Sequence, residues 1–181
     1  MAKLEKGMRF PCKEVNTLYK GQTTTDELIA GRKTVFWFLR YLGCTVCRYD
    51  IHVASQRYEE IKEKDAQIVF VLQSRKDLLE EELKDVDLPF DIISDPEMKL
   101  YKDFDIRPGK DRDELLGGQG DKLAAKGQAA RDAGFSHGEY EGDELQLPAM
   151  FITDGNGEIV FAKYAENIVD LPTMDELKEL L

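Results

Sequence analysis

Two cysteines separated by two residues, Cys44 and Cys47, are the side chains of this sequence best suited to chemistry. They follow a run of β-branched and aromatic residues, Thr34–Leu39, and open a segment of helical periodicity. A cysteine at the amino end of a helix meets unpaired N–H groups and a partial positive charge, which favour the thiolate. Cys44 is therefore the expected nucleophile. Cys47, one helical turn later, is the expected resolving cysteine, which attacks a mixed disulfide or a sulfenic acid on Cys44.

Other readings of these residues stay open at this point. Arg40 and Arg48 flank the pair and could add positive potential, or they could be solvated surface charges. A structural zinc site needs four ligands, and the remaining candidates, Cys12, His52 and His137, are scattered without ligand spacing. No metal is therefore expected. Two buried, inert thiols are the remaining alternative, and Cys12 is itself expected to be a small buried side chain.

The elements that must hold the cysteine pair alternate between strand and helix. Strands are expected at 34–39, 67–73 and 90–94, and helices at about 45–64, from a Ser74–Asp77 capping box to Val86, and from Asp95-Pro96 to Phe104. A hairpin is expected over 149–162, and a helix capped by Thr173 and Glu176 follows it. This order predicts an α/β, thioredoxin-like fold, in which helices flank a mixed central β-sheet.

A proline and a long insertion precede the hairpin. Pro148 stands at the start of the strand 149–153, where a missing N–H is unexpected unless the geometry is special. In a thioredoxin-like fold this place faces the cysteine pair and is a cis-proline. Residues 105–146 form the insertion, with a helix expected at about 121–133. The insertion is either a lid lined by Phe135, His137 or Tyr140, or a solvated surface decoration.

Composition sets broader limits on the function. The chain has 181 residues, which suits one domain over 1–181, and its net charge is −11. Such a surface disfavours nucleic acid and anionic membranes, whose binding depends on Lys and Arg. The start of the chain lacks the long apolar stretch of a signal peptide, so a cytoplasmic location with reduced thiols is expected. No flavin or nicotinamide motif is present, so no cofactor is expected and electrons should arrive through a partner thiol.

Three segments of the sequence resemble a known family: Gly43–Arg48 after an aromatic strand, Leu147–Ile159, and Gly7–Pro11. Together they resemble the AhpC/TSA redoxins, the peroxiredoxin-like members of the thioredoxin superfamily. The resemblance implies a thioredoxin fold, antioxidant or thiol-exchange activity, and a nucleophilic cysteine that matches Cys44. The expected supporting residues are Tyr41, Thr45, Arg48 and Pro148.

The sequence also departs from the peroxiredoxin signature Pro-x-x-x-Thr-x-x-Cys. Trp37 stands in the place of the proline and Tyr41 in the place of the threonine, whose hydroxyl helps to hold peroxide in the family. The family's distal arginine is expected just before Ala149, where this chain has Gln146 and Leu147. These departures favour thiol–disulfide exchange over peroxide reduction.

Three functions therefore remain under consideration. The first is a thiol–disulfide oxidoreductase whose partner is a thioredoxin-like reductant or a disulfide-containing protein. The second is a thiol-dependent peroxidase that reduces small hydroperoxides. The third is a non-catalytic zinc-binding or partner-binding module. Homodimers are common among the relatives, although the sequence shows no interface.

Overall fold

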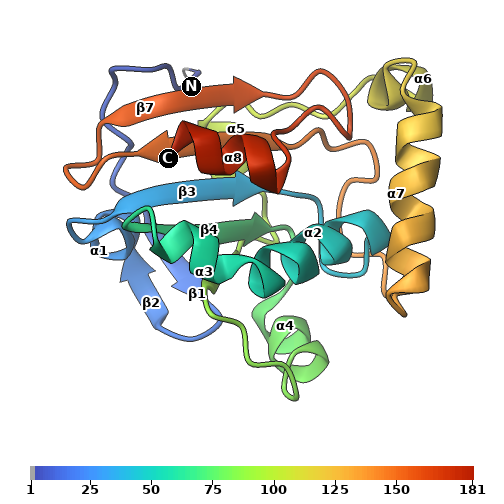
Figure 1. Ribbon diagram of the computed structural model, residues 1–181, viewed down its shortest axis with the longest axis horizontal. Coiled ribbons are helices and arrows are strands. Elements are labelled where there is room, and N and C mark those ends of the chain that lie inside the picture. The colour runs from blue at the N-terminus through green and yellow to red at the C-terminus, as the bar shows by residue number, and fades with distance from the viewer. Residues whose placement is uncertain (1–2) are drawn as a thin grey trace.

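The computed structural model describes residues 3–181, which form a seven-stranded sheet with helices on both faces (Figure 1). Met1 and Ala2, which belong to the start considered for a signal peptide, lie outside the described residues. The strands are β1 Glu14–Thr17, β2 Gly21–Thr24, β3 Lys33–Phe38, β4 Ala66–Leu72, β5 Asp91–Ser94, β6 Ala149–Thr153 and β7 Ile159–Tyr164. The helices are α1 Thr25–Ile29, α2 Thr45–Gln56, α3 Tyr58–Lys62, α4 Lys76–Glu82, α5 Lys99–Asp103, α6 Arg112–Leu116, α7 Gly120–Asp132 and α8 Met174–Leu180.

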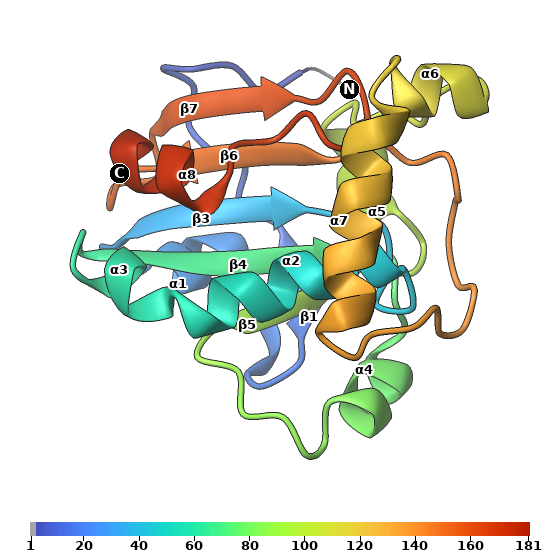
Figure 2. The ribbon, with the colours of Figure 1, turned by 45° about the vertical axis from the view of Figure 1, so that its right-hand side comes forward.

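The strand order in the sheet is β2-β1-β5-β4-β3-β6-β7. β3, β4 and β5 are parallel, whereas β6 pairs antiparallel with both β3 and β7, and β1 pairs antiparallel with β2 and β5. The expected mixed sheet flanked by helices is confirmed. Since the parallel strands all end at one edge of the sheet, the turn from β3 into α2 lies at that edge (Figure 2).

Side chains of β3 alternate between two hydrophobic cores. Val35 and Trp37 pack with residues of α2, α3 and α8 on one face. Phe36 and Phe38 pack with residues of α1 and α5 on the other. Because both faces are covered, five of the six residues of β3 are buried, which explains why the strand reads as an unbroken apolar run.

Two helices, α2 and α3, occupy the segment in which a single helix over 45–64 was expected. The chain leaves helical geometry at Arg57, where φ is −107° and ψ is 15°. The guanidinium of Arg57 binds Glu60 at 2.8 Å and Asp175 of α8 at 2.6 Å. Buried side chains continue across the break, with Ala54 before it and Tyr58 after it, so the apolar pattern carries no sign of the interruption.

The helix α4 begins differently from the prediction. No capping box forms between Ser74 and Asp77, because the Ser74 hydroxyl is used elsewhere: it accepts the Leu42 N–H at 2.8 Å and donates to Glu141 at 2.6 Å. The helix starts at Lys76 without a side-chain cap. By contrast, the box formed by Thr173 and Glu176 at the start of α8 is confirmed. The hairpin of β6 and β7 is confirmed as well.

The amino-terminal segment holds elements that the sequence pattern did not predict, namely β1, β2 and α1. Phe10 anchors this segment by stacking on Phe36, with ring centroids 4.2 Å apart. Cys12, two residues later, is exposed, so the expectation that it is buried is wrong. The chain runs along the surface between the buried residues Phe10 and Val15, and the Cys12 side chain faces outward.

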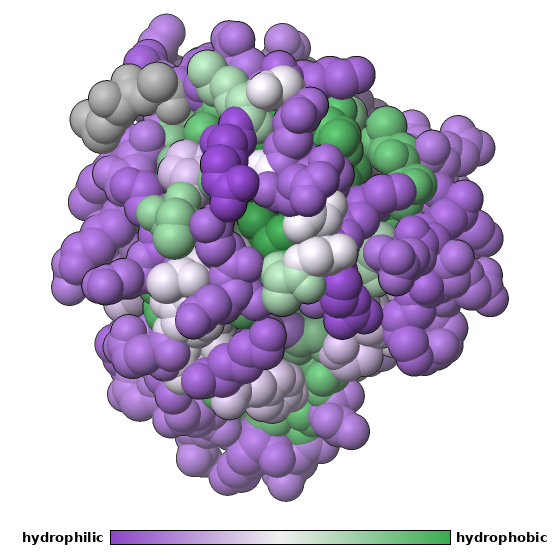
Figure 3. Space-filling model, turned by 90° about the vertical axis from the view of Figure 1, so that its left-hand side faces the viewer, coloured by the Kyte–Doolittle hydropathy of each residue, from purple (hydrophilic) through white to green (hydrophobic). Residues whose placement is uncertain are grey.

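The end of the molecule that carries the β6–β7 turn, opposite to the turn after β3, is largely hydrophilic (Figure 3). Separate apolar patches interrupt this hydrophilic surface (Figure 3). In residues 3–181 no helix has both the length and the apolar character needed to cross a bilayer.

Candidate active site at the Cys44–Cys47 turn

Cys44 lies where the sheet ends and α2 begins. It is the N-cap residue of α2, and its Sγ atom accepts the backbone N–H of Cys47 at 3.4 Å. Both cysteines are buried, and their sulfur atoms are not joined by a disulfide. The expectation that the first cysteine meets the free N–H groups of a helix start is therefore confirmed.

Arg40 supplies the positive charge at this site. Its Nη2 atom donates to the Sγ atom of Cys44 at 3.0 Å, and its side chain is only 12% exposed. The pKa of Cys44 is lowered to about 6 by hydrogen bonding from the Cys47 side chain, by the Arg40 charge and by the Cys47 N–H, against the opposing effect of burial. The sulfur atoms in turn raise the pKa of Arg40, although burial opposes its charge. These interactions favour the thiolate form of Cys44.

Cys47 has the opposite character. Burial, reinforced by the neighbouring Cys44, raises its pKa well above the ordinary value of a thiol. The two environments thus favour ionisation of Cys44 before Cys47. A nucleophile next to a protonated second thiol is the asymmetry that stepwise thiol exchange requires.

Among the residues expected to support the cysteine pair, Tyr41 and Arg48 make their side-chain contacts with residues other than the two cysteines. Tyr41 is fully buried, and its hydroxyl hydrogen-bonds to Glu144 and lies 3.3 Å from Nε2 of His137, so it is engaged with the insertion. Thr45 is the first residue of α2 and is half-buried. Arg48 binds Glu82 at 3.1 Å and lies over the Phe135 ring, so it is Arg40 that donates to the nucleophile.

The segment 138–144, which we call the strap, covers the cysteine turn. The Gly138 N–H donates to the Gly43 carbonyl at 2.8 Å. A side chain on Gly43 would collide with the backbone of Glu139, and one on Gly138 would lie 3.1 Å from the Cα atom of Gly43. The absence of both side chains permits this close approach. Cys44, the residue after Gly43, has no exposed surface.

Two acidic residues, Glu141 and Glu144, attach the strap to Ser74, Arg75 and Arg40, which surround the site. Glu141 accepts from the Ser74 hydroxyl at 2.6 Å and from the Arg75 N–H at 3.0 Å. The Glu144 carbonyl accepts from Nη1 of Arg40 at 2.7 Å, and its carboxylate lies 3.8 Å from the same atom. These contacts join residues far apart in the sequence, and nothing in the periodicity of the chain indicated them. The sequence signal that could have indicated these contacts is the cluster of acidic residues from Glu139 to Glu144, since it complements the charges of Arg40 and Arg75.

Pro148 is buried directly before β6, but the peptide bond that precedes it is trans, as are the other described peptide bonds. The prediction of a cis-proline is wrong. The chain before it is already held by long-range bonds: Gln146 pairs with Pro108 and donates to the Ile106 carbonyl at 3.1 Å. The trans form is the intrinsic preference of a peptide bond before proline. The side-chain amide of the buried Gln146 donates hydrogen bonds to backbone carbonyls here, in the place where the family's arginine was expected.

The two histidines lie on the strap side of the site without forming a metal centre. His52 packs edge-on against Phe135, with centroids 5.1 Å apart, and His137 stacks on Tyr140 at 4.0 Å. Within residues 3–181 no three His, Cys, Asp or Glu side chains come together in a group that could hold a metal ion.

Comparison with known proteins identifies the family and the fold of this chain. The model of the AhpC/TSA family matches residues 7–162. The chain belongs to the AhpC/TSA family. A search of curated proteins found no match to this chain. AhpC/TSA membership supports a redox function of the peroxidase type.

Three solved structures resemble this chain over nearly its whole length. A mutant of peroxiredoxin 6 of Arenicola marina has a TM-score of 0.72 at 14% identity, over 97% of this chain and 70% of that chain. The AhpC of Mycobacterium tuberculosis has a TM-score of 0.66 at 20% identity, over 98% and 91%. The reduced 2-Cys peroxiredoxin of Plasmodium vivax has a TM-score of 0.65 at 13% identity, over 96% and 78%. These similarities show that the fold is thioredoxin-like.

Proposed function

We propose that the protein is a thiol–disulfide oxidoreductase of the AhpC/TSA type, with Cys44 as nucleophile and Cys47 as resolving cysteine. The observation that carries the proposal is the unequal environment of the pair. The Sγ atom of Cys44 accepts hydrogen bonds from Arg40 and from the Cys47 N–H, whereas Cys47 is buried with a raised pKa. One sulfur is thus prepared to attack and the other to resolve.

The reaction proceeds in two exchanges. The Cys44 thiolate attacks one sulfur of a substrate disulfide, a new S–S bond forms, and the other substrate sulfur leaves as a thiolate. The Cys47 thiol then passes its proton to that leaving group and attacks the Cys44 sulfur. This second exchange releases the remaining substrate thiolate and forms the Cys44–Cys47 disulfide. Two electrons reach the substrate, and a thioredoxin-like reductant restores the pair.

The strap acts as a lid in this scheme. Cys44 has no exposed surface beneath it, so a disulfide reaches the sulfur only when the strap moves aside. The contacts that hold the strap are hydrogen bonds and ion pairs with partly exposed groups, such as Arg75 with Glu139 at 3.4 Å. Contacts of this kind open at small cost compared with a packed core.

Trapping of the mixed disulfide tests the proposal. The exposed Cys12 would form adducts of its own, so every protein carries Cys12→Ser. With oxidised glutathione and mass spectrometry, Cys47→Ser should retain glutathione on Cys44, whereas the parent should release it and form the internal disulfide. Cys44→Ser should form no adduct. An adduct on Cys47 in that variant, or none on Cys44 when Cys47 is replaced, would contradict the assignment.

A thiol-dependent peroxidase is the second candidate, and one observation favours it. The Nε atom of Arg40 is buried and has no hydrogen-bond partner among the described residues. It could donate to an oxygen of a peroxide small enough to pass the strap. The thiolate would then take one oxygen as a sulfenic acid and release hydroxide, and condensation with Cys47 would release water.

Stopped-flow oxidation of the reduced protein separates the two candidates. Trp37 is the single tryptophan and lies in the core beneath α2, so its fluorescence reports on the pair. Hydrogen peroxide and oxidised glutathione are compared at equal concentration. Faster oxidation by the disulfide supports the first candidate. Faster oxidation by peroxide supports the second, and a rate with peroxide no higher than that of free cysteine excludes it.

A further inference from the structure

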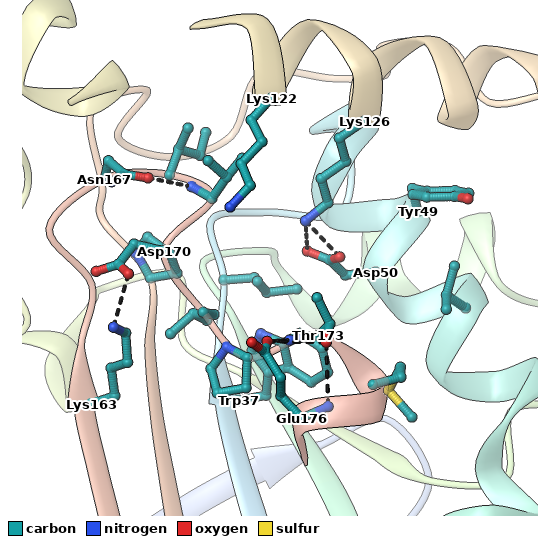
Figure 4. A pocket seen from close by; sticks show the side chains of 18 of the residues that line it. Trp37, Tyr49, Asp50, Lys122, Lys126, Lys163, Asn167, Asp170, Thr173 and Glu176 are labelled. Atoms are coloured by element: carbon teal, nitrogen blue, oxygen red, sulfur yellow. Dashed lines mark hydrogen bonds and ion pairs between the residues drawn. The ribbon is translucent and has the colours of Figure 1, made fainter. Parts of the chain in front are cut away.

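A groove of 1040 Å³ lies beside the cysteine turn but outside it (Figure 4). Its walls are α2, α7 and the segment that leads from β7 into α8. Its apolar lining includes Trp37, Leu39, Pro148, Phe161 and Leu171. Neither cysteine belongs to the lining, so thiol chemistry does not explain the groove.

Most of the charges around the groove are already paired. Asp50 holds Lys126 at 2.6 Å, and Asp170 holds Lys163 at 2.8 Å. Glu176 accepts the Thr173 N–H at 2.7 Å as part of the capping box of α8. Asp50 and Asp170 are therefore neutralised by Lys126 and Lys163, and the same contacts neutralise these two lysines.

Lys122 differs from Lys126 and Lys163 in its contacts. It lies one turn before Lys126 on α7, and both lysines extend from this helix over the groove (Figure 4). No ion pair or hydrogen bond engages its ammonium group within the part of the chain described. The lining acid without such a contact, Glu179, belongs to the last turn of α8. The C-terminal end of α8 points away from α7 (Figure 2). Lys122 therefore adds one positive charge without a direct partner next to the Asp50–Lys126 pair, at a distance from Asp170 and Glu176 at which it helps to lower the pKa of both acids.

We propose that this groove binds an amphipathic organic acid. The apolar body of the ligand would lie on Trp37, Leu39 and Phe161, where it removes hydrophobic surface from water. Its carboxylate would meet the ammonium group of Lys122 at the α7 end, beside the Asp50–Lys126 pair. Charge complementarity decides the class of ligand, because an apolar floor with an unpaired lysine at one end suits a single anionic head and an uncharged body.

Titration with decanoate and with decanol tests this assignment. The two probes share the apolar chain and differ in the charged head, and calorimetry together with Trp37 fluorescence reports their binding to the reduced protein. Decanoate should bind more tightly than decanol, and added salt should weaken only decanoate. Lys122→Glu should weaken decanoate about tenfold through loss of attraction and new repulsion, with no change for decanol.

Matched variants give this test its controls. Lys64→Glu makes the same charge change on an exposed lysine outside the groove and should leave both affinities unchanged. Phe161→Ala should weaken both probes alike. The double variant Cys44→Ser, Cys47→Ser should still bind decanoate, which separates this site from the thiol site. Equal binding of the two probes, indifference to Lys122→Glu, or loss of binding in the double serine variant would overturn the proposal.

Discussion

The Nη2 atom of Arg40 lies 3.0 Å from the Sγ atom of Cys44, and these two residues are four positions apart on either side of the turn from β3 into α2. This contact joins the end of the central strand to the N-cap of the helix. Its geometry provides a guanidinium donor at the nucleophile from within the cysteine turn itself. In this chain Gln146, near the place of the family's distal arginine, is occupied with backbone carbonyls.

Removal of this charge should raise the pKa of Cys44. In Arg40→Met the thiolate loses an opposite charge within hydrogen-bond distance, so the pH at which half of Cys44 is ionised should rise from about 6 by at least about one pH unit. The ultraviolet absorbance of the thiolate, followed against pH in a Cys12→Ser background, measures this midpoint. Arg48→Met is the matched control and should leave it unchanged, since Arg48 binds Glu82.

The same depressed pKa should make the stability of the reduced protein depend on pH. The folded state ionises Cys44 at about 6, whereas an unfolded thiol ionises near 9, so the unfolded chain binds more protons between these values. Stability should therefore rise with pH across this window and be lost as pH falls through about 6. The contribution is at most about 4 kcal/mol, at about 1.4 kcal/mol for each pH unit.

Urea unfolding at a series of pH values measures this slope. Cys44→Ser should flatten it, because a serine does not titrate in this range. A slope that persists in Cys44→Ser would assign the effect to another group. Above the ordinary pKa of a thiol, Cys47 acts in the opposite direction, since its raised pKa favours the unfolded state there.

Weakening the strap should expose Cys44. Glu141→Ala removes the acceptor of two hydrogen bonds, from Ser74 and from the Arg75 N–H, without touching the cysteine turn. The rate of alkylation of Cys44 by a bulky maleimide should increase about tenfold or more, as expected for the loss of roughly 1.5–3 kcal/mol of charge-assisted hydrogen bonding. Mass spectrometry of the alkylated peptide follows the rate.

Glu63→Ala serves as the comparison for Glu141→Ala, because Glu63 is an exposed acid far from the strap in the sequence. It should leave the rate of alkylation as in the parent. An unchanged rate in Glu141→Ala would mean that the strap does not limit access.

The pair of Asp50 and Lys126 should hold α7 against α2. Both side chains are mostly buried, at 17% and 26% exposure, and burial raises the pKa of Asp50 despite the lysine. Lys126→Met leaves a buried carboxylate without its partner and should cost about 3 kcal/mol in the free energy of unfolding. The double change Asp50→Leu, Lys126→Met should recover most of that loss, as urea unfolding would show.

Local signals in the sequence determined much of this protein. The apolar runs of β3 and β4, the hairpin of β6 and β7, and the capping box of Thr173 and Glu176 each depend on neighbours within a few residues, and each was predicted. The cysteine pair at the junction of strand and helix belongs to the same class, since N-capping by Cys44 is a local event.

Tertiary structure alone decided the environment of the pair. The closure of the strap through Glu141 and Glu144 depends on contacts between residues tens of positions apart. The choice of Arg40 over Arg48 as the donor to Cys44 depends on where the two side chains point in the folded protein. Sequence periodicity reports which face of an element is buried, but it does not report which distant polar groups meet there. The side chains that tune a reactive cysteine therefore become visible only once the chain has folded around it.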